Sequence, residues 1–202
     1  SNITIVKDKD NLSNLVSRDI GPGNCLIDNW VRKNSNKKFD QDGFLAASGI
    51  RDEIIFEQAQ ELYANRKNKK KMSFDTNDFD ISFMRGLTFE NGVTTLTDFT
   101  ASIIGEELSI SLKESKQKFQ KILLCGGGRK NKILIKKIKE KLPSNIDLKL
   151  IDEYKVNGDF IESQAFAFLA VRSNLKLPIS FPNTTGCKTV SYTHLTLPTM
   201  FE

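Results

Sequence analysis

Two glycine-containing segments carry the residue types that could hold a phosphate group. The first is Asp19-Ile20-Gly21-Pro22-Gly23-Asn24, which leads into an apolar run that begins at Cys25. The second is the Gly-Gly-Gly run at 126–128, which follows apolar residues and precedes Arg129-Lys130-Asn131. Each pattern predicts an extended segment, a turn without side chains and a helix start. Backbone N–H groups in such a turn approach an anion closely, and the helix dipole favours the negative charge.

Each candidate residue also has a purely structural interpretation. Asp19 is a candidate for holding Mg²⁺ through water, because Mg²⁺ prefers a few carboxylates together with water and phosphate oxygens. Its alternative role is to bond its own backbone in an Asx-type turn. Gly21 and Gly23 would admit a phosphate, while Asn24 is either a phosphate contact or an ordinary N-cap. Gly126, Gly127, Gly128 and Asn131 are candidate nucleotide contacts, and the alternative is simple turn chemistry.

The elements that would position these residues alternate between strands and helices. Strands are expected over 3–6, returning as a hairpin through 12–16, and over 121–125 and 146–151. Helices are expected over these ranges: 25–33, 41–63 with a bend at Gly49, 94–112, 130–141 and 159–174. Strands that alternate with crossover helices favour parallel pairing covered by helices, which is the α/β class.

Apolar spacing also predicts which side chains are buried. The helix over 41–63 is expected to share one apolar face made of Phe44, Ala47, Ile54 and Leu62. The helix over 159–174 is expected to turn inward Ile161, Ala165, Phe168 and Leu169. Cys125, at the end of an apolar run, is expected to be a buried strand residue, and Trp30 is expected in the core.

Composition limits the class of protein. The chain has 202 residues of which 39% are hydrophobic, enough for one substantial core. The three cysteines have spacings typical of neither a metal site nor a disulfide framework, which favours the reducing cytoplasm. No apolar stretch approaches the ~20 residues that cross a bilayer. His194 is the only histidine, so phosphoryl transfer, which depends on positioning, metal charge and a carboxylate, fits better than histidine chemistry.

The net charge of +5 raises the alternative of nucleic-acid binding. Lysines cluster at 67–71 and at 130–141. The second cluster shares its helix with Ile133, Leu134 and Ile138, so it is typical of a solvated helix face, and it has no aromatic residues for base stacking. A basic nucleic-acid-binding domain is therefore the weaker alternative.

Blocks spread along the chain resemble the anhydro-N-acetylmuramic acid kinase family, sugar kinases of the actin/hexokinase-like superfamily. Besides the two glycine segments, the blocks are these: Phe-Asp-Gln-Asp-Gly at 39–43, Lys-Met-Ser-Phe-Asp at 71–75, Thr-Thr-Leu-Thr-Asp-Phe-Thr-Ala at 94–101, the Gly-Asp-Phe-Ile-Glu run at 158–170 and Phe-Pro-Asn-Thr-Thr-Gly at 181–186. They occur in the family's order and at about its spacing as far as Thr189.

The resemblance implies a fold, a reaction and partners. The fold would be an actin/hexokinase-like (ribonuclease H-like) α/β lobe, a mixed sheet flanked by helices. The reaction would use ATP and Mg²⁺: a base activates water to open the 1,6-anhydro ring while O6 takes the γ-phosphoryl, giving N-acetylmuramic acid 6-phosphate in cell-wall recycling. The full-length enzyme is expected to be a cytoplasmic homodimer without nucleic-acid or membrane partners. Glu162 and Ser73 would contact the sugar, and the alternative for Glu162 is a solvated helical acid.

Both ends of the sequence differ from the family pattern. Members of the family carry a Gly-Thr-Ser-x-Asp-Gly phosphate loop and a Gly-Asp-Phe-Arg segment whose aspartate is the base, and neither occurs here. We therefore expect 1–189 to be the C-terminal portion of such a kinase, mostly its second lobe, with no catalytic residue of its own. The alternative is a catalytically silent nucleotide-binding lobe. Residues 190–202 resemble a translated sequencing adapter, and we expect them to be a non-native tail.

Overall fold

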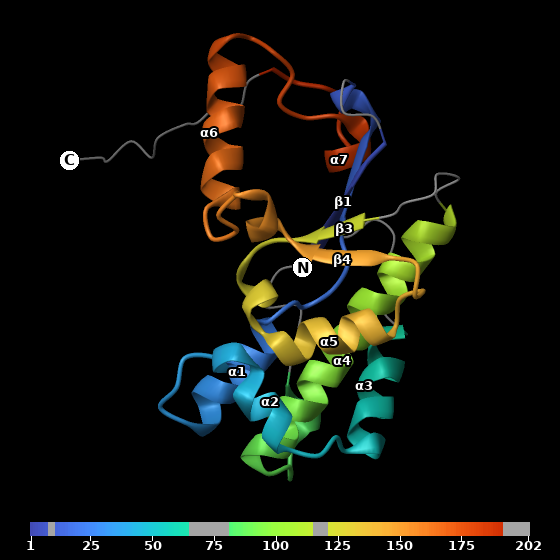
Figure 1. Cartoon of the computed structure of the whole chain (residues 1–202), viewed down its shortest axis with the longest axis vertical. Helices are drawn as coiled ribbons and strands as arrows, with labels where there is room; N and C mark the ends of the chain where they lie inside the picture. The colour runs from blue at the N-terminus through green and yellow to red at the C-terminus, as the bar shows by residue number, and fades with distance from the viewer. Residues whose placement is uncertain (8–10, 65–80, 115–120, 192–202) are drawn as a thin grey trace, which may run out of the picture. The chain divides into compact units, whose positions relative to one another are not determined.

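The computed structural model describes residues 1–7, 11–64, 81–114 and 121–191 (Figure 1). The chain divides into two compact units, which are described separately. The first consists of Ser1–Ile3 and Arg18–Asp159, and the second of Thr4–Ser17 and Phe160–Glu202. None of the helices in the described ranges combines the length and the apolar character that crossing a bilayer requires.

Strands β1 (Asn2–Val6) and β2 (Leu15–Asp19) pair with each other, as the sequence predicts. The return strand begins later than expected, because Leu12–Asn14 forms the 3-10 turn η1. Asn11 stabilises this turn, since its Oδ1 accepts hydrogen bonds from the backbone N and Oγ of Ser13 at 3.1 and 2.5 Å. A short side chain that bonds the backbone two residues later favours a turn over a strand.

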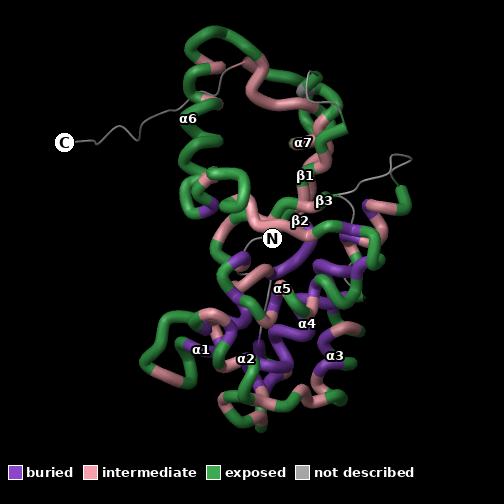
Figure 2. The backbone as a smooth tube through the Cα atoms, viewed as in Figure 1, coloured by how far each residue is buried: buried purple, intermediate pink, exposed green. Residues whose placement is uncertain are grey.

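Helix α4 (Phe89–Glu114) is the centre of the first unit and contacts the surrounding helices α1, α2, α3 and α5 (Figure 1). Its middle is buried on nearly every side, as the purple tube in Figure 2 shows. The sequence predicts this helix, although its start lies at Phe89 and not at 94 or 95. The neighbouring helices are α1 (Cys25–Asn34), α2 (Phe44–Ser48), α3 (Glu53–Ala64) and α5 (Lys132–Glu140).

Trp30 of α1 packs directly on α4, in the core where the sequence places it. Its side chain is 8% exposed, and its Nε1 donates to the Phe89 carbonyl at 3.0 Å. The indole leaves no room for a side chain at position 92, because a Cβ on Gly92 would lie 2.3 Å from Cε2 of Trp30. Glycine on α4 therefore lets the indole approach the helix backbone.

The sequence predicts a helix over 41–63 with a bend at Gly49. The position of the bend is right, but the chain breaks there into α2 and α3, so the continuous helix is wrong. Gly49 is extended there, and a Cβ on it would lie 2.4 Å from the Glu90 carbonyl of α4. Side chains of α4 accept the backbone N–H groups of the break: Asn91 Oδ1 accepts from Ile50 at 2.9 Å and Thr95 Oγ1 from Asp52 at 3.0 Å. Hydrogen bonds to side chains of α4 thus replace the backbone hydrogen bonds that a continuous helix would make between α2 and α3.

The break also shifts which side chains of this segment are buried. Phe44, Ala47, Ile54 and Leu62, the predicted inward face, are all exposed. The buried residues are Ala46, Phe56, Ala59 and Tyr63. A helical period counted across 41–63 fails because the residues between Ser48 and Glu53 do not turn with the helix.

A second hydrophobic cluster forms where α4 and α5 meet strand β3 (Lys121–Leu124) and strand β4 (Asp147–Leu150). The two strands are parallel, with Lys121 opposite Asp147 and Leu124 opposite Leu150. Ile122 and Leu148 pack against this cluster, whereas Leu123 is 45% exposed. Small sheets flanked by helices confirm the predicted α/β class, although the described strands form separate pairs and not one mixed sheet.

Cys125 is exposed, so the prediction that it is a buried strand residue is wrong. The strand ends at Leu124, and alternating side chains place Cys125 on the same face as exposed Leu123. The apolar run alone predicts burial on both faces, but the described residues cover only one. All three cysteines, Cys25, Cys125 and Cys187, are free.

The second unit contains α6 (Ile161–Asn174) and α7 (Pro182–Thr185). Helix α7 contacts η1, and Asn183 Nδ2 donates to the Ser13 carbonyl at 3.5 Å. The inward face predicted for α6 is wrong: Ala165 and Phe168 are exposed, while Ile161 and Leu169 are half-buried, so its tube is mostly green in Figure 2. Its apolar residues surround the helix without a dominant side, a pattern that does not select one face for burial.

Candidate nucleotide site

The first glycine turn lies between β2 and α1 and is held by α3 and α4. Tyr63 Oη of α3 donates to the Ile20 carbonyl at 2.8 Å, and Thr100 Oγ1 of α4 donates to the Gly23 carbonyl at 3.4 Å. A Cβ on Gly21 would lie 2.7 Å from Cγ2 of Ile103, and Gly23 has a φ of +58°. Packing and backbone conformation therefore each require a glycine here, whether or not a ligand binds.

The second turn differs, because two of its glycines face open space. Gly126 has a φ of 76° and a ψ of 179°, a conformation that is essentially restricted to glycine. A Cβ on Gly126 or Gly127 would meet no atom of the described residues within 4 Å, and the φ of Gly127 lies outside the left-handed region. Neither packing within the described residues nor φ accounts for glycine at 127. Its small size leaves room for a group to approach the backbone.

The N–H groups of this turn are also accessible. The 3-10 turn η5 (Gly127–Lys130) follows Gly126, whose own N–H donates to the Gly158 carbonyl at 3.3 Å. Within the described residues, no hydrogen bond to an acceptor outside η5 is made by the N–H of Gly127 or Gly128. Adjacent N–H groups without internal acceptors form the type of concave site that binds phosphate oxygens.

The two glycine turns meet at Asn24. A Cβ on Gly128 would lie 3.5 Å from Asn24 Oδ1. That oxygen is buried and has no hydrogen-bond partner among the described residues. Asn24 occupies the N-cap position of α1, but its side chain makes no capping bond. Asn24 therefore occupies the N-cap position without making an N-cap hydrogen bond. Its acceptor Oδ1, unpaired among the described residues, lies between the two turns.

Asn131 serves as the N-cap of α5. Its Oδ1 accepts from the Leu134 N–H at 3.0 Å, and the residue is 4% exposed. A Cβ on Gly43 would lie 2.4 Å from the same oxygen, so the turn before α2 packs over this cap. The role observed for Asn131 is structural, and its contact with a nucleotide stays a prediction.

A charged cluster lies directly behind the second turn, and the motif that contains Arg129 does not predict it. The Arg129 cluster consists of Arg129, Lys130, Asp152 and Asp159. Arg129 Nε and Nη2 donate to Asp152 Oδ2 and Oδ1 at 2.7 and 3.0 Å, and Nη1 donates to Asp159 Oδ1 at 2.8 Å. Lys130 Nζ lies 2.7 Å from Asp159 Oδ2. The carboxylates lie more than twenty residues after the arginine, so no local pattern links them.

Hydrogen bonds within the cluster shift the pKa values of Arg129, Asp152 and Asp159. Hydrogen bonds from Arg129 lower the pKa of Asp152 to about 2, and those from Arg129 and Lys130 lower the pKa of Asp159. The same bonds raise the pKa of the Arg129 guanidinium. The guanidinium side chain is only 5% exposed, and the carboxylates are partly open to water at 41% and 43%. Arg129, Asp152 and Asp159 are therefore charged at neutral pH.

Asp19 is half-buried at the end of β2, directly before the first turn. In the part of the chain that the structure describes, no group of three or more His, Cys, Asp or Glu side chains could hold a metal ion. The predicted mode needs only one carboxylate beside a phosphate, and Asp19 would supply it. A single carboxylate with water and phosphate oxygens suits Mg²⁺, and the assignment stays a prediction.

The sugar contacts of Glu162 and Ser73 stay predictions. Glu162 lies in the first turn of α6, in the second unit, and is exposed. Ser73, with Asp75, lies outside the described residues. Tail residues 192–202, His194 included, also lie outside them, while Val190 contacts the preceding segment because its carbonyl accepts from the Ile179 N–H at 2.9 Å.

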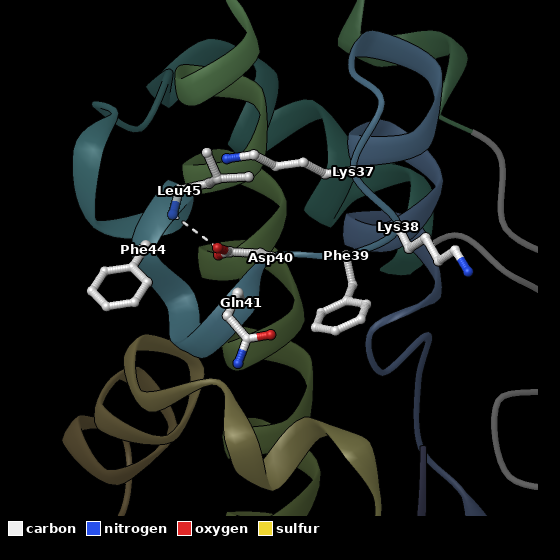
Figure 3. Close-up of a pocket in the computed structure, with 7 residues that line it drawn as sticks. All are labelled: Lys37, Lys38, Phe39, Asp40, Gln41, Phe44 and Leu45. Atoms are coloured by element: carbon white, nitrogen blue, oxygen red, sulfur yellow. Dashed lines mark hydrogen bonds between the residues drawn. The ribbon is translucent and has the colours of Figure 1, made fainter.

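A surface pocket lies beside α2 (Figure 3). Its lining residues are Lys37, Lys38, Phe39, Asp40, Gln41, Phe44 and Leu45. Asp40 points into the α2 backbone, where its carboxylate accepts from the N–H groups of Leu45 and Ala46 at 2.8 and 3.0 Å. Asp40 thus acts as a helix cap, and none of the lining residues is a predicted nucleotide contact.

Comparison with known proteins identifies a consistent set of relatives. The model of a family described as "Anhydro-N-acetylmuramic acid kinase" matches residues 1–197. The relative of that name from Pelagibacter ubique (strain HTCC1062) is 53% identical over 188 residues, 93% of this chain and 50% of the relative. The relative from Zymomonas mobilis subsp. mobilis is 34% identical over 188 residues, covering 92% and 48%. The relative from Rhodospirillum rubrum is 36% identical over 171 residues, covering 85% and 44%.

The chain spans about half the length of the curated relatives it matches. The family match extends past residue 189, where the quoted motifs end. The boundary between 1–189 and a non-native tail stays a prediction.

Proposed function

The chain belongs to the anhydro-N-acetylmuramic acid kinase family, and we propose that it supplies the nucleotide-holding lobe of an ATP-dependent kinase acting on 1,6-anhydro-N-acetylmuramic acid. The α/β architecture agrees with the actin/hexokinase-like lobe expected for this family. The observation that carries the proposal is the meeting of the two glycine turns, where Asn24 Oδ1 lies beside Gly128.

In this proposal the second turn receives phosphate oxygens. The N–H groups of Gly127 and Gly128 have no acceptor outside their own turn in the described residues, and Gly127 leaves space for the ligand. Helix α5 begins directly behind the turn, so its dipole favours the negative charge. The first turn, with Asp19, would hold the water shell of Mg²⁺, which supplies positive charge against the phosphates when bound.

The family resemblance implies a reaction that combines hydrolysis of the anhydro ring with a phosphoryl transfer. Water adds across the bond between C1 and the bridging oxygen, O6. The freed O6 takes the γ-phosphoryl of ATP, which leaves ADP and N-acetylmuramic acid 6-phosphate. Glu162 and Ser73 are the proposed sugar contacts. The Gly-Asp-Phe-Arg segment that carries the base in the family is absent from these 202 residues. We place the reaction in the cytoplasm, where free cysteines such as these stay reduced.

The proposal is tested with a hybrid kinase, in which this chain replaces the matching half of the Pelagibacter ubique relative. We expect the hybrid to phosphorylate the anhydro-sugar from γ-phosphate-labelled ATP, and the 202-residue chain alone to give no turnover, because it lacks the segment with the base. A hybrid that binds ATP but never turns over would favour the alternative of a catalytically silent nucleotide-binding lobe. A hybrid that is folded but binds no ATP would refute the proposal.

A further inference from the structure

Arg129 is directly bonded to the backbone of the second glycine turn. Its Nη1 donates to the Gly126 carbonyl at 2.9 Å, in addition to the bonds that the guanidinium makes with Asp152 and Asp159. The Gly126 N–H donates to the Gly158 carbonyl, and the Gly158 N–H donates to Asp152 Oδ1 at 3.2 Å. Both polar groups of the Gly126 backbone are therefore held, directly or through one residue, by the Arg129 cluster.

The guanidinium is closely enclosed on the side of Gly158. A Cβ on Gly158 would lie 2.3 Å from Arg129 Nε, so only glycine there lets the guanidinium reach both carboxylates. The planar fork of arginine suits this position, because it binds a carboxylate with two parallel bonds and still has a donor for a carbonyl. An ammonium group at the same place could not make all of these bonds at once.

Stability alone is a weak reason for such a cluster. A buried charge loses hydration, and replacing a buried ion pair with apolar groups is often neutral or stabilising. The Arg129 cluster does, however, fix a backbone conformation that is unfavourable elsewhere. Gly126 has a φ and ψ that chains rarely adopt, and such conformations persist only when the surroundings hold them.

We propose that Arg129 is a positioning residue for the nucleotide: it holds the Gly126 peptide so that the N–H groups of Gly127 and Gly128 stay directed at the ligand. The identity of the ligand in this inference rests on the proposed function. The hydrogen bonds by which Arg129 holds the turn do not depend on the proposed function. Asp152 and Asp159 act through Arg129, and neither is assigned a contact with the nucleotide.

The test compares substitutions in the 202-residue chain. Arg129→Met removes the charge and the fork, and Arg129→Lys keeps the charge but not the fork. Arg18→Met is the matched control, because Arg18 also pairs with a carboxylate and a hydroxyl, Glu107 at 3.1 Å and Ser111 at 3.0 Å, away from the turn. Each variant is checked for folding by circular dichroism. Amide hydrogen exchange at Gly126–Gly128 and titration with MgATP are then followed by NMR.

We expect exchange of the Gly126 amide to rise by about tenfold in both Arg129 variants and to stay unchanged in Arg18→Met. We expect MgATP affinity to fall by about tenfold in both, an effect typical of residues that orient a ligand-contacting group. A folded Arg129→Lys chain with wild-type exchange and wild-type affinity would overturn the proposal. If Arg129→Met does not fold, Arg129→Lys alone decides.

The hydrogen-exchange measurement and the MgATP titration together separate this inference from the proposed function. If the wild-type chain gives no MgATP shifts while exchange at Gly126 rises in both Arg129 variants, the hold on the turn is supported and nucleotide binding by this chain is not. If wild-type MgATP shifts appear and neither Arg129 variant changes them or the exchange, the positioning role is refuted and the proposed function survives.

Discussion

A substitution at Gly127 separates an effect on ATP binding from an effect on folding stability. Alanine at 127 would place its Cβ in open space, and the residue does not have a left-handed φ. We therefore expect Gly127→Ala to leave the free energy of unfolding within about 0.5 kcal/mol or to raise it by about 0.4–1 kcal/mol, since alanine restricts the unfolded chain. The added methyl group would still lie where a phosphate must approach the backbone.

Gly126→Ala is the contrasting variant, because its conformation is nearly restricted to glycine. We expect it to lower the free energy of unfolding by about 1–3 kcal/mol. Urea denaturation of the 202-residue chain measures both values, and the hybrid kinase measures the binding of ATP.

The expected result for Gly127→Ala is unchanged stability together with ATP binding at least about tenfold weaker, a loss of about 1.4 kcal/mol in binding free energy. A stable Gly127→Ala hybrid that binds ATP with wild-type affinity would show that the space beside Gly127 is not used by the ligand. An unstable Gly127→Ala chain would contradict the open geometry of the turn.

Three further predictions test other parts of the site. In the hybrid kinase, Asp19→Asn should lower kcat by an amount equivalent to ~2.7–4 kcal/mol while sugar binding changes little, as expected for lost electrostatic stabilisation. A near-normal kcat at saturating Mg²⁺ would leave Asp19 only its role in an Asx-type turn. In acid, the stabilisation from Asp152 is complete above its ordinary pKa and is lost as the pH falls toward about 2, and that from Asp159 is lost in the same direction because its pKa is also lowered. The free energy of unfolding should therefore depend less on pH in this acid range in Arg129→Met, which a pH titration of unfolding measures. Asn131→Ala should lower the free energy of unfolding by about 0.5–2 kcal/mol through the lost helix cap, and urea denaturation with no change would contradict that role.

Local patterns predicted the elements whose causes are local. The helix after Asn24, strand β3 and helix α5 each follow from a turn signal next to a periodic apolar run. The parallel pairing of β3 with β4 follows from the helix between them. The two glycine turns were also recognisable, because each places glycines between an extended segment and a helix.

Two departures from the predictions have causes that lie far away in the sequence, and a third has a local cause. The break at Gly49 depends on Asn91 and Thr95, which accept its backbone N–H groups from another helix. The Arg129 cluster depends on carboxylates brought near by strand β4 and the turn before α6. The exposure of Phe168 could not follow from periodicity, because apolar residues surround α6.

The most direct measurement is a crystal structure of the hybrid kinase with a non-hydrolysable ATP analogue. We expect the phosphate oxygens to accept from the N–H groups of Gly127 and Gly128, and the hydrated metal to lie at the first turn, beside Asp19. An analogue whose phosphates lie away from both turns, with Gly127 still open to solvent, would contradict this expectation.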